Sequence, residues 1–220
     1  MKTRTSLLVS SSTCIGGLAA LMAALPLYLY FPIIPYLRFE LAEIPVVLGF
    51  LVLGPETAAL SSVVYWLVLL LVGEYSPIGP TMKFTAVICM VLGLWLGFRL
   101  RRSPRTGLLI GSCLGCLFRV AAMSAFNYVV IVIMVPSFLE TAAASISAVL
   151  GISFPNELTA FLAVLGFTAV FNIIHTILSI APAYLLVKAV IKAGGEGRAI
   201  RKIWYVDVIR AASRRAPPRS

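Results

Sequence analysis

Long apolar segments decide what this chain can fold into. Six of them carry few charges, and they lie at residues 6–30, 43–54, 56–73, 81–100, 107–135 and 158–191. About 20 apolar residues in a helix cross the hydrocarbon core of a bilayer. With 60% hydrophobic and 12% charged residues, the chain also lacks the charge that a soluble domain needs on its surface. The sequence therefore predicts an all-α integral membrane protein, a bundle of six transmembrane helices.

Two of these segments need comment. The first begins like a signal peptide, but it stays apolar long enough to span the bilayer, so we interpret it as a retained helix. The second is too short to span and ends at Gly54-Pro55, a strong helix breaker, so we expect neighbouring elements to cover it. The organisation predicted is a membrane domain at residues 1–192 and a basic cytoplasmic tail at residues 193–220.

The distribution of charge predicts the orientation. With both termini inside and six crossings, the cytoplasmic segments contain 15 of the 18 basic residues, and five of the eight acids fall on the outer side. This asymmetry follows the positive-inside rule and predicts a multi-pass protein of the cell membrane with both termini in the cytoplasm. The basic tail is expected to meet anionic membrane lipid rather than nucleic acid.

The connection between the first two segments is unusual. Residues 31–45 read FPIIPYLRFELAEIP, an aromatic and aliphatic stretch that three prolines stiffen and that carries Glu40 and Glu43 beside Arg38. An ordinary loop between spanning helices is short and polar. We therefore interpret this loop as an extracellular lid that folds back over a pocket for a small, flat, partly apolar solute.

Polar residues within the apolar segments are candidates for a binding site, because they are costly in hydrocarbon. The last segment carries a polar stripe at helical spacing, and the fifth carries three further polar residues: Thr168, Asn172, His175, Thr176 and Ser179, and Arg119, Asn127 and Tyr128. For Asn172 with His175 we favour a ligand site over hydrogen bonding between helices. For Arg119, a structural pair with Glu56 and snorkelling to the interface both remain open.

Small residues recur at intervals of four on three segments, a pattern that lets helices approach closely in lipid. On the fourth and fifth segments we expect internal packing, through Gly93 and Gly97 and through Gly107, Gly111 and Gly115. On the first segment, Gly16, Ala20 and Ala24 form either an internal face or a partner interface, and the pattern does not decide between the two.

Several kinds of chemistry find no support in the sequence. His175 is the single histidine, and no residues have metal-ligand spacing. The chain has neither a phosphate-binding GxxxxGK[ST] loop nor a nucleophile with a nearby base. We therefore predict that the chain is not an enzyme, carries no cofactor or metal, and does not hydrolyse ATP itself. A lipid-modifying membrane enzyme and a structural subunit without a ligand are the rival interpretations.

Three motifs resemble one family, the substrate-binding S components of energy-coupling factor (ECF) vitamin transporters, and within it the riboflavin-specific branch. These motifs are the loop at residues 31–45 with VVLGFLVLGPETAAL at 46–60, FNYVVIVIMVPSF at 126–138, and FNIIHTILSIAPAYLLVK at 171–188. The resemblance implies a six-helix bundle that binds riboflavin from outside. It also implies partnership with a transmembrane T component and two cytoplasmic ATPases.

The resemblance further assigns roles to particular residues. It places Tyr36, Leu37, Phe39 and Glu40 in the lid, Asn127, Asn172 and His175 against the ligand, and Gly16, Ala20 and Ala24 against the T component. The sequence departs from the family pattern at His175, where a lysine is usual, and at Glu40 and Glu43, where aspartates are usual. Lys83 is an unexpected charge. These departures leave another vitamin or a nucleobase-like solute as an alternative ligand.

Overall fold

The protein is an elongated helical bundle in which seven helices, α1–α7, are described. The computed structural model describes residues 4–25, 28–73, 75–100, 103–194 and 203–208. The helices are α1 Arg4–Ala24, α2 Ile44–Leu53, α3 Pro55–Val72, α4 Ile78–Leu100, α5 Pro104–Asn127, α6 Ser137–Leu150 and α7 Glu157–Gly194. Two strands, β1 Tyr28–Tyr30 and β2 Arg38–Glu40, form a hairpin after α1, and η1 Leu41–Glu43 joins it to α2. A π-helix, η2 Tyr128–Met134, continues α5.

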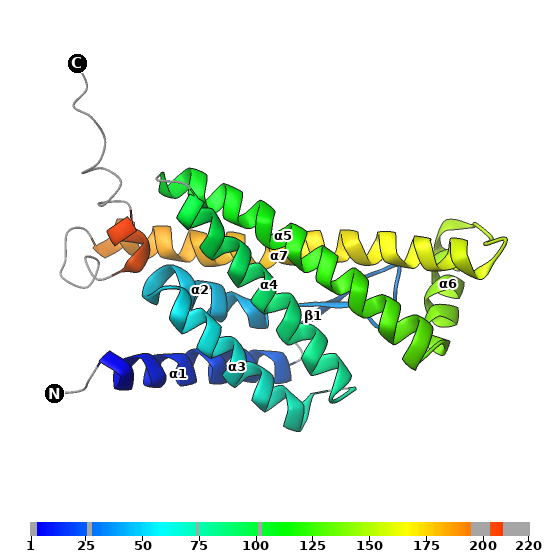
Figure 1. The fold of residues 1–220 in the computed structure, drawn as a ribbon, viewed down its shortest axis with the longest axis horizontal. Coiled ribbons are helices and arrows are strands. Elements are labelled where there is room, and N and C mark those ends of the chain that lie inside the picture. The colour runs from blue at the N-terminus through cyan, green and yellow to red at the C-terminus, as the bar shows by residue number, and fades with distance from the viewer. Residues whose placement is uncertain (1–3, 26–27, 74, 101–102, 195–202, 209–220) are drawn as a thin grey trace, which may run out of the picture.

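Each predicted apolar segment contains a helix, but the first was predicted to extend to residue 30, whereas α1 ends at Ala24 and Tyr28–Tyr30 form β1. Five helical spans are long and apolar enough to cross a membrane, and α2 is shorter, as the sequence predicted. The seventh helix, α6, was not predicted. It crosses the far ends of α5 and α7 (Figure 1), where it packs through Ala142 and Ile146. The described residues thus contain five candidate spans and two shorter apolar helices, so the predicted count of six transmembrane helices is not confirmed.

Glycines bring α4 and α5 into backbone contact. A Cβ atom added at Gly93 would lie 2.0 Å from the backbone nitrogen of Gly115, and one added at Gly97 would lie 2.2 Å from that of Gly111. No side chain larger than hydrogen fits between helices this close. The internal packing predicted for these glycines is confirmed.

Helix α1 packs against α3 through its small residues. A Cβ atom at Gly16 would lie 2.6 Å from the Cβ of Val64, and Ala20 is buried, whereas Ala24 is exposed. Of the two interpretations that the sequence left open, internal packing is therefore the one that Gly16 and Ala20 adopt here. A partner contact at Ala24 stays a prediction.

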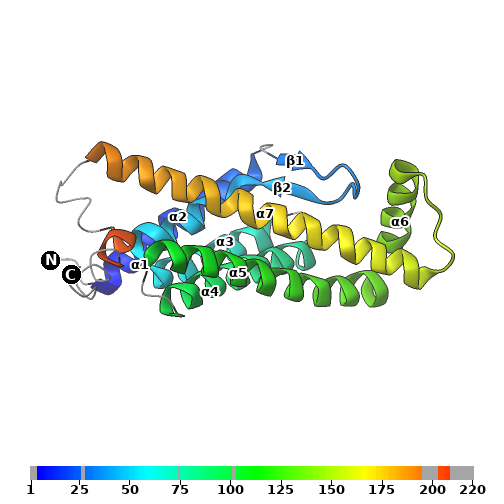
Figure 2. The same cartoon turned by 90° about the horizontal axis from the view of Figure 1, so that it is seen from above.

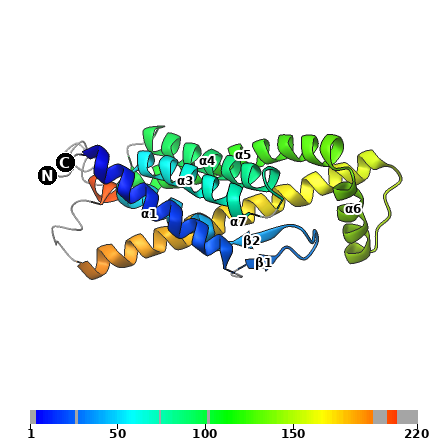
Figure 3. The same ribbon diagram turned by 90° about the horizontal axis from the view of Figure 1, so that it is seen from below.

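The loop after α1 is a hairpin that descends into the bundle. Strands β1 and β2 pair antiparallel with Leu29 opposite Phe39, and Figures 2 and 3 show the hairpin beside α7, reaching toward α6. Phe31 and Ile34 are buried against residues of α6 and α7. Backbone outside a helix is tolerated at this depth only when protein covers it, and the bundle supplies that cover.

One end of the molecule gathers the start of α1, the turn between α2 and α3, and the last turns of α7 (Figure 1). Residues 203–208, part of the predicted tail, lie there as a short helical turn. Ile203, Tyr205 and Val206 are buried in the same core cluster as α2, α4 and α7. This part of the tail therefore packs on protein, which the lipid interpretation did not foresee.

Gly93→Ala should destabilise the bundle, because the new methyl group overlaps the α5 backbone and the two helices must separate. Overpacking of this kind costs about 1–3 kcal/mol or more. The matched control is Gly166→Ala on α7, where an added Cβ meets nothing within 4 Å. Thermal unfolding in detergent should show a lowered midpoint for Gly93→Ala alone. Equal midpoints for the two variants would contradict the close helix packing.

Candidate functional site

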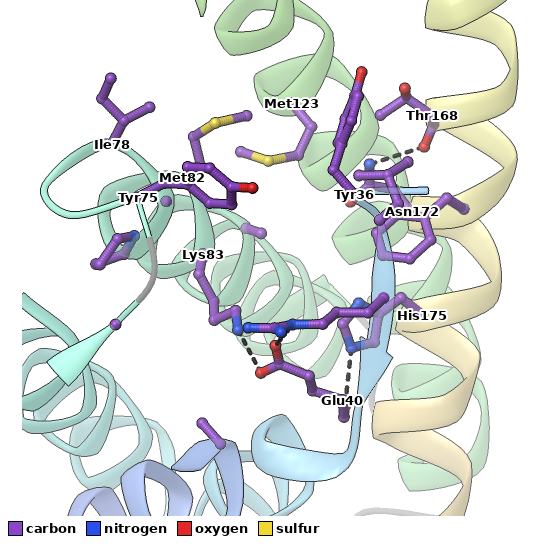
Figure 4. A pocket seen from close by; sticks show the side chains of 18 of the residues that line it. Tyr36, Glu40, Tyr75, Ile78, Met82, Lys83, Met123, Thr168, Asn172 and His175 are labelled. Carbon is purple, nitrogen blue, oxygen red and sulfur yellow. Dashed lines mark hydrogen bonds and ion pairs between the residues drawn. The ribbon is translucent and has the colours of Figure 1, made fainter. Parts of the chain in front are cut away.

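A large cavity lies between the hairpin and α4, α5 and α7. Its volume is about 580 Å³, within the range of small-molecule sites. Figure 4 shows Tyr36, Met82, Met123 and Asn172 around it. Residues of all three sequence motifs, which lie far apart in the chain, line the cavity, and this convergence makes it the candidate substrate site.

The floor of the cavity is a buried ion pair. Arg119 of α5 donates to both carboxylate oxygens of Glu43, from Nη1 at 2.6 Å and from Nη2 at 3.0 Å, and the hydroxyl of Ser179 donates to Glu43 at 2.9 Å. The side chains of Arg119 and Glu43 are 3% and 1% exposed, so water does not compensate either charge. Of the two interpretations for Arg119, the structural pair is the one observed, but its partner is Glu43 and not Glu56, which lies 3.7 Å from Arg4.

His175 is held on both ring nitrogens. Nδ1 lies 3.0 Å from Nη2 of Arg119, and Nε2 lies 3.0 Å from the backbone oxygen of Glu40. A guanidinium can only donate and a carbonyl can only accept, so Nδ1 is the acceptor and Nε2 carries the proton. His175 is therefore the neutral Nε2–H tautomer. Both of its polar atoms are used within the protein, and it meets the cavity with its ring.

The orientation of the Asn172 side-chain amide follows in the same way from its hydrogen bonds. Nε of Arg119 donates to Oδ1 at 3.0 Å, and Nδ2 donates to the backbone oxygen of Thr168 at 2.9 Å. Since neither partner can exchange its role, the amide cannot be flipped. One N–H of Asn172 remains without a described protein partner, beside the cavity that Asn172 lines.

Three further buried polar groups lack a partner among the described residues, and one of them, the hydroxyl of Tyr65, belongs to a residue that does not line the cavity. Nδ2 of Asn127 and the hydroxyl of Tyr36 are buried without a hydrogen bond, and both residues line the cavity. Asn127 is the last α-helical residue before the π-helix η2, a kind of helix that often occurs at functional sites. A buried polar atom without a partner costs roughly 1–3 kcal/mol, and a bound ligand is one way to satisfy it.

Glu40 joins the hairpin to the opposite wall. Its carboxylate pairs with Lys83 of α4 across the cavity (Figure 4) and accepts from Nε of Arg38 at 3.0 Å. The guanidinium of Arg38 also lies over the ring of Tyr28, 4.8 Å from its centroid. Lys83, the charge that the family pattern did not explain, thus serves as a counter-ion of the hairpin.

Aromatic rings form the remaining walls. The ring of Tyr36 stacks on Phe138 of α6 at a centroid distance of 5.2 Å, and Tyr75 meets the same ring edge-on. Behind the hairpin, Phe39 stacks on Phe171 at 4.6 Å. Rings from the hairpin, α6 and α7 thus hold the hairpin in place and give the cavity flat apolar sides.

Six of the seven residues predicted for substrate binding line this cavity: Tyr36, Leu37, Glu40, Asn127, Asn172 and His175. Phe39 supports the wall instead, through its stacking on Phe171. Sequence reasoning missed the roles of Lys83 and of Glu43 as partners across the site. Their signal was present, since each is a charged residue next to or within an apolar segment and needs an opposite charge.

Replacing Arg119 with Met should destabilise the protein strongly, because Glu43 then remains buried without a counter-charge. Breaking one partner of a buried pair costs about 3–5 kcal/mol, whereas replacing both partners with apolar residues is often tolerated. The double variant Arg119→Met with Glu43→Leu should therefore recover part of the lost thermal stability. A double variant less stable than Arg119→Met alone would show that the two side chains do not compensate each other.

Comparison with known proteins agrees with this architecture. The profile of the family described as ECF transporter, substrate-specific component, matches residues 11–187. A solved structure of the S component of a bacterial ECF transporter superimposes with a TM-score of 0.66 over 86% of this chain and 98% of the other, at 17% identity, a likeness that concerns the fold. No curated protein matches the sequence. The chain belongs to the substrate-specific components of ECF transporters, membrane subunits that bind a transported solute, associate with a T component and ATPases, and are not enzymes.

Proposed function

We propose that the chain binds riboflavin at the cavity described above and delivers it for import. The observation that carries the proposal is the combination of flat aromatic walls with buried polar groups that lack partners on Tyr36 and Asn127. An isoalloxazine ring is flat, apolar on its faces and polar along one edge. Its carbonyl oxygens and ring nitrogens would accept from the amide groups of Asn127 and Asn172.

The hydrogen bonds already made within the protein indicate where the polar edge of the ligand would lie. Arg119, Glu43 and His175 are bonded to one another or to the hairpin, so the floor has little left to offer a ligand. Asn172 lies one turn from His175 along α7, on the side of Thr168 (Figure 4). The ligand would therefore rest above the ion pair, with its polar edge toward the two asparagines and Tyr36.

Charge supports the direction of binding. The end of the molecule with the α2–α3 turn carries Arg4, Arg99, Lys188 and Lys192, whereas Glu140 and Glu157 lie toward the other end, near α6. By the positive-inside rule, the first end would be cytoplasmic. The aromatic cluster of Tyr36, Tyr75 and Phe138 would then stand at the outer side, between the external solution and the cavity.

Another vitamin or a nucleobase-like solute is the second candidate, and Lys83 is the observation that favours it. Lys83 lines the cavity, and its ammonium group pairs with Glu40. Neutral riboflavin offers that ammonium no counter-ion, whereas an anionic solute would compete with Glu40 for it.

Purified, ligand-stripped protein should quench riboflavin fluorescence with one-to-one stoichiometry. Asn127→Ala should weaken binding by at least about 1 kcal/mol, or about fivefold, because a ligand acceptor loses its donor. The matched control is Asn156→Ala, since Asn156 is exposed and caps Thr159 away from the site. If the unaltered protein does not quench the fluorescence, riboflavin is not its ligand, and a copurifying solute would then be identified by mass spectrometry.

The contact with the T component should use the exposed face of α1. Gly17 has nothing within 4 Å of an added Cβ, whereas Gly16 meets Val64. Gly17→Leu should therefore leave riboflavin affinity unchanged but reduce copurification with the T component and ATPases, and reduce uptake. Gly16→Leu should instead lower thermal stability. Normal assembly of the Gly17→Leu variant would move the partner interface away from this face of α1.

A further inference from the structure

A short segment beyond α7 is part of the folded core. The family profile ends at residue 187, so residues 203–206 lie outside the part of the chain that it matches. Ile203, Tyr205 and Val206 are nevertheless buried, and a helical turn orders them, with the amide of Val206 donating to the oxygen of Ile203 at 3.0 Å. We call residues 203–206 the latch.

Trp204 of the latch closes on the end of α2. Its ring meets Phe50 of α2 and Phe98 of α4 edge-on, each at a centroid distance of 5.2 Å. It also covers Gly54, the residue that ends α2, where an added Cβ would lie 3.2 Å from the indole. Gly54 has φ of +105°, which a side chain would strain. The α2–α3 turn is thus shaped to receive the indole.

Tyr205 extends this contact to two further helices. Its ring lies 6.0 Å from that of Phe98 on α4 and 6.0 Å from that of Tyr184 on α7. The latch thereby joins α2, α4 and α7 at the end of the bundle opposite α6 (Figure 1).

The other end of α2 is held by the floor of the cavity. Glu43 immediately precedes α2, and its carboxylate is bound by Arg119 and Ser179. The backbone oxygen of Glu40, three residues earlier, accepts from His175. Ten residues of helix, about 15 Å, separate the two clamps. Helix α2 is a buried rod with the latch at one end and the hairpin at the other.

From this geometry we infer that the latch controls the hairpin through α2, so that docking of Trp204 holds the hairpin closed over the cavity and undocking lets it open. A helix moves as a rigid element, so freedom gained at Gly54 reaches Glu43 and the hairpin along the same rod. A cytoplasmic event that displaces residues 203–206 would then change how long the ligand stays. This regulation concerns the proposed binding site, and its ligand readout rests on the proposed function.

The test compares Trp204→Ala with Trp95→Ala in the full-length protein. Trp95 is also on the α4 side of the bundle, but its indole is 36% exposed and pairs with Arg99. Two quantities are measured: amide hydrogen exchange of residues 38–43 without ligand, and the dissociation rate of riboflavin. Trp204→Ala should accelerate both by about fivefold or more, the lower range of coupling between distant sites. Trp95→Ala should change neither.

A conservative variant guards against simple loss of folding. Trp204→Phe keeps an aromatic ring at the turn and should give values between those of the unaltered protein and Trp204→Ala. Faster exchange confined to the α2–α3 turn would overturn the inference and make the latch a local cap. Equal acceleration by Trp95→Ala would overturn it too. If the unaltered protein does not bind riboflavin, the ligand proposal fails, and the exchange of residues 38–43 alone decides the inference.

Discussion

The ion pair of Arg119 with Glu43 is the interaction on which the site depends. It joins α5 to the start of α2, and through Nε and Nη2 the same guanidinium orients Asn172 and His175 of α7. A bidentate pair of this kind is directional, so it fixes positions as well as supplying energy. Without it, α5 would lose its ion pair with Glu43, and Asn172 and His175 would lose the donor that orients them.

The ion pair also determines which polar atoms around the cavity already have hydrogen-bond partners. Every polar atom that Arg119 reaches is already bonded, whereas Asn127 and Tyr36, which Arg119 does not reach, keep unpaired atoms. Every residue of the polar stripe on α7 makes a hydrogen bond within the protein, and the buried polar atoms of cavity-lining residues that lack a described partner lie on α5 and in the hairpin. The sequence showed one continuous stripe, because helical spacing records the face of a residue and not its partners.

Much of the fold followed from the sequence because hydropathy and charge act over long segments. The bounds of α2 through α5 agree closely with the predicted segments, and the family resemblance placed six site residues around one cavity. Helix α6 was not predicted because it is too short, and too rich in small and hydroxylated residues, to resemble a membrane span. The strands were not predicted because a strand of three residues is too short to show an alternation of polar and apolar residues. Glu43 was assigned to an outer loop; its charge beside an apolar segment indicated that it needs a partner, but no local pattern identified that partner as Arg119.

The neutral histidine in the floor has a consequence for the membrane potential. Arg119 and Glu43 cancel, and His175 as the Nε2–H tautomer adds no charge, so these three residues form an electrically neutral unit. Moving one elementary charge across 100 mV is worth about 2.3 kcal/mol. A lysine at position 175, as the family resemblance leads one to expect, would make any displacement of this floor along the membrane normal sensitive to voltage. With histidine, the displacement of this unit is independent of the voltage.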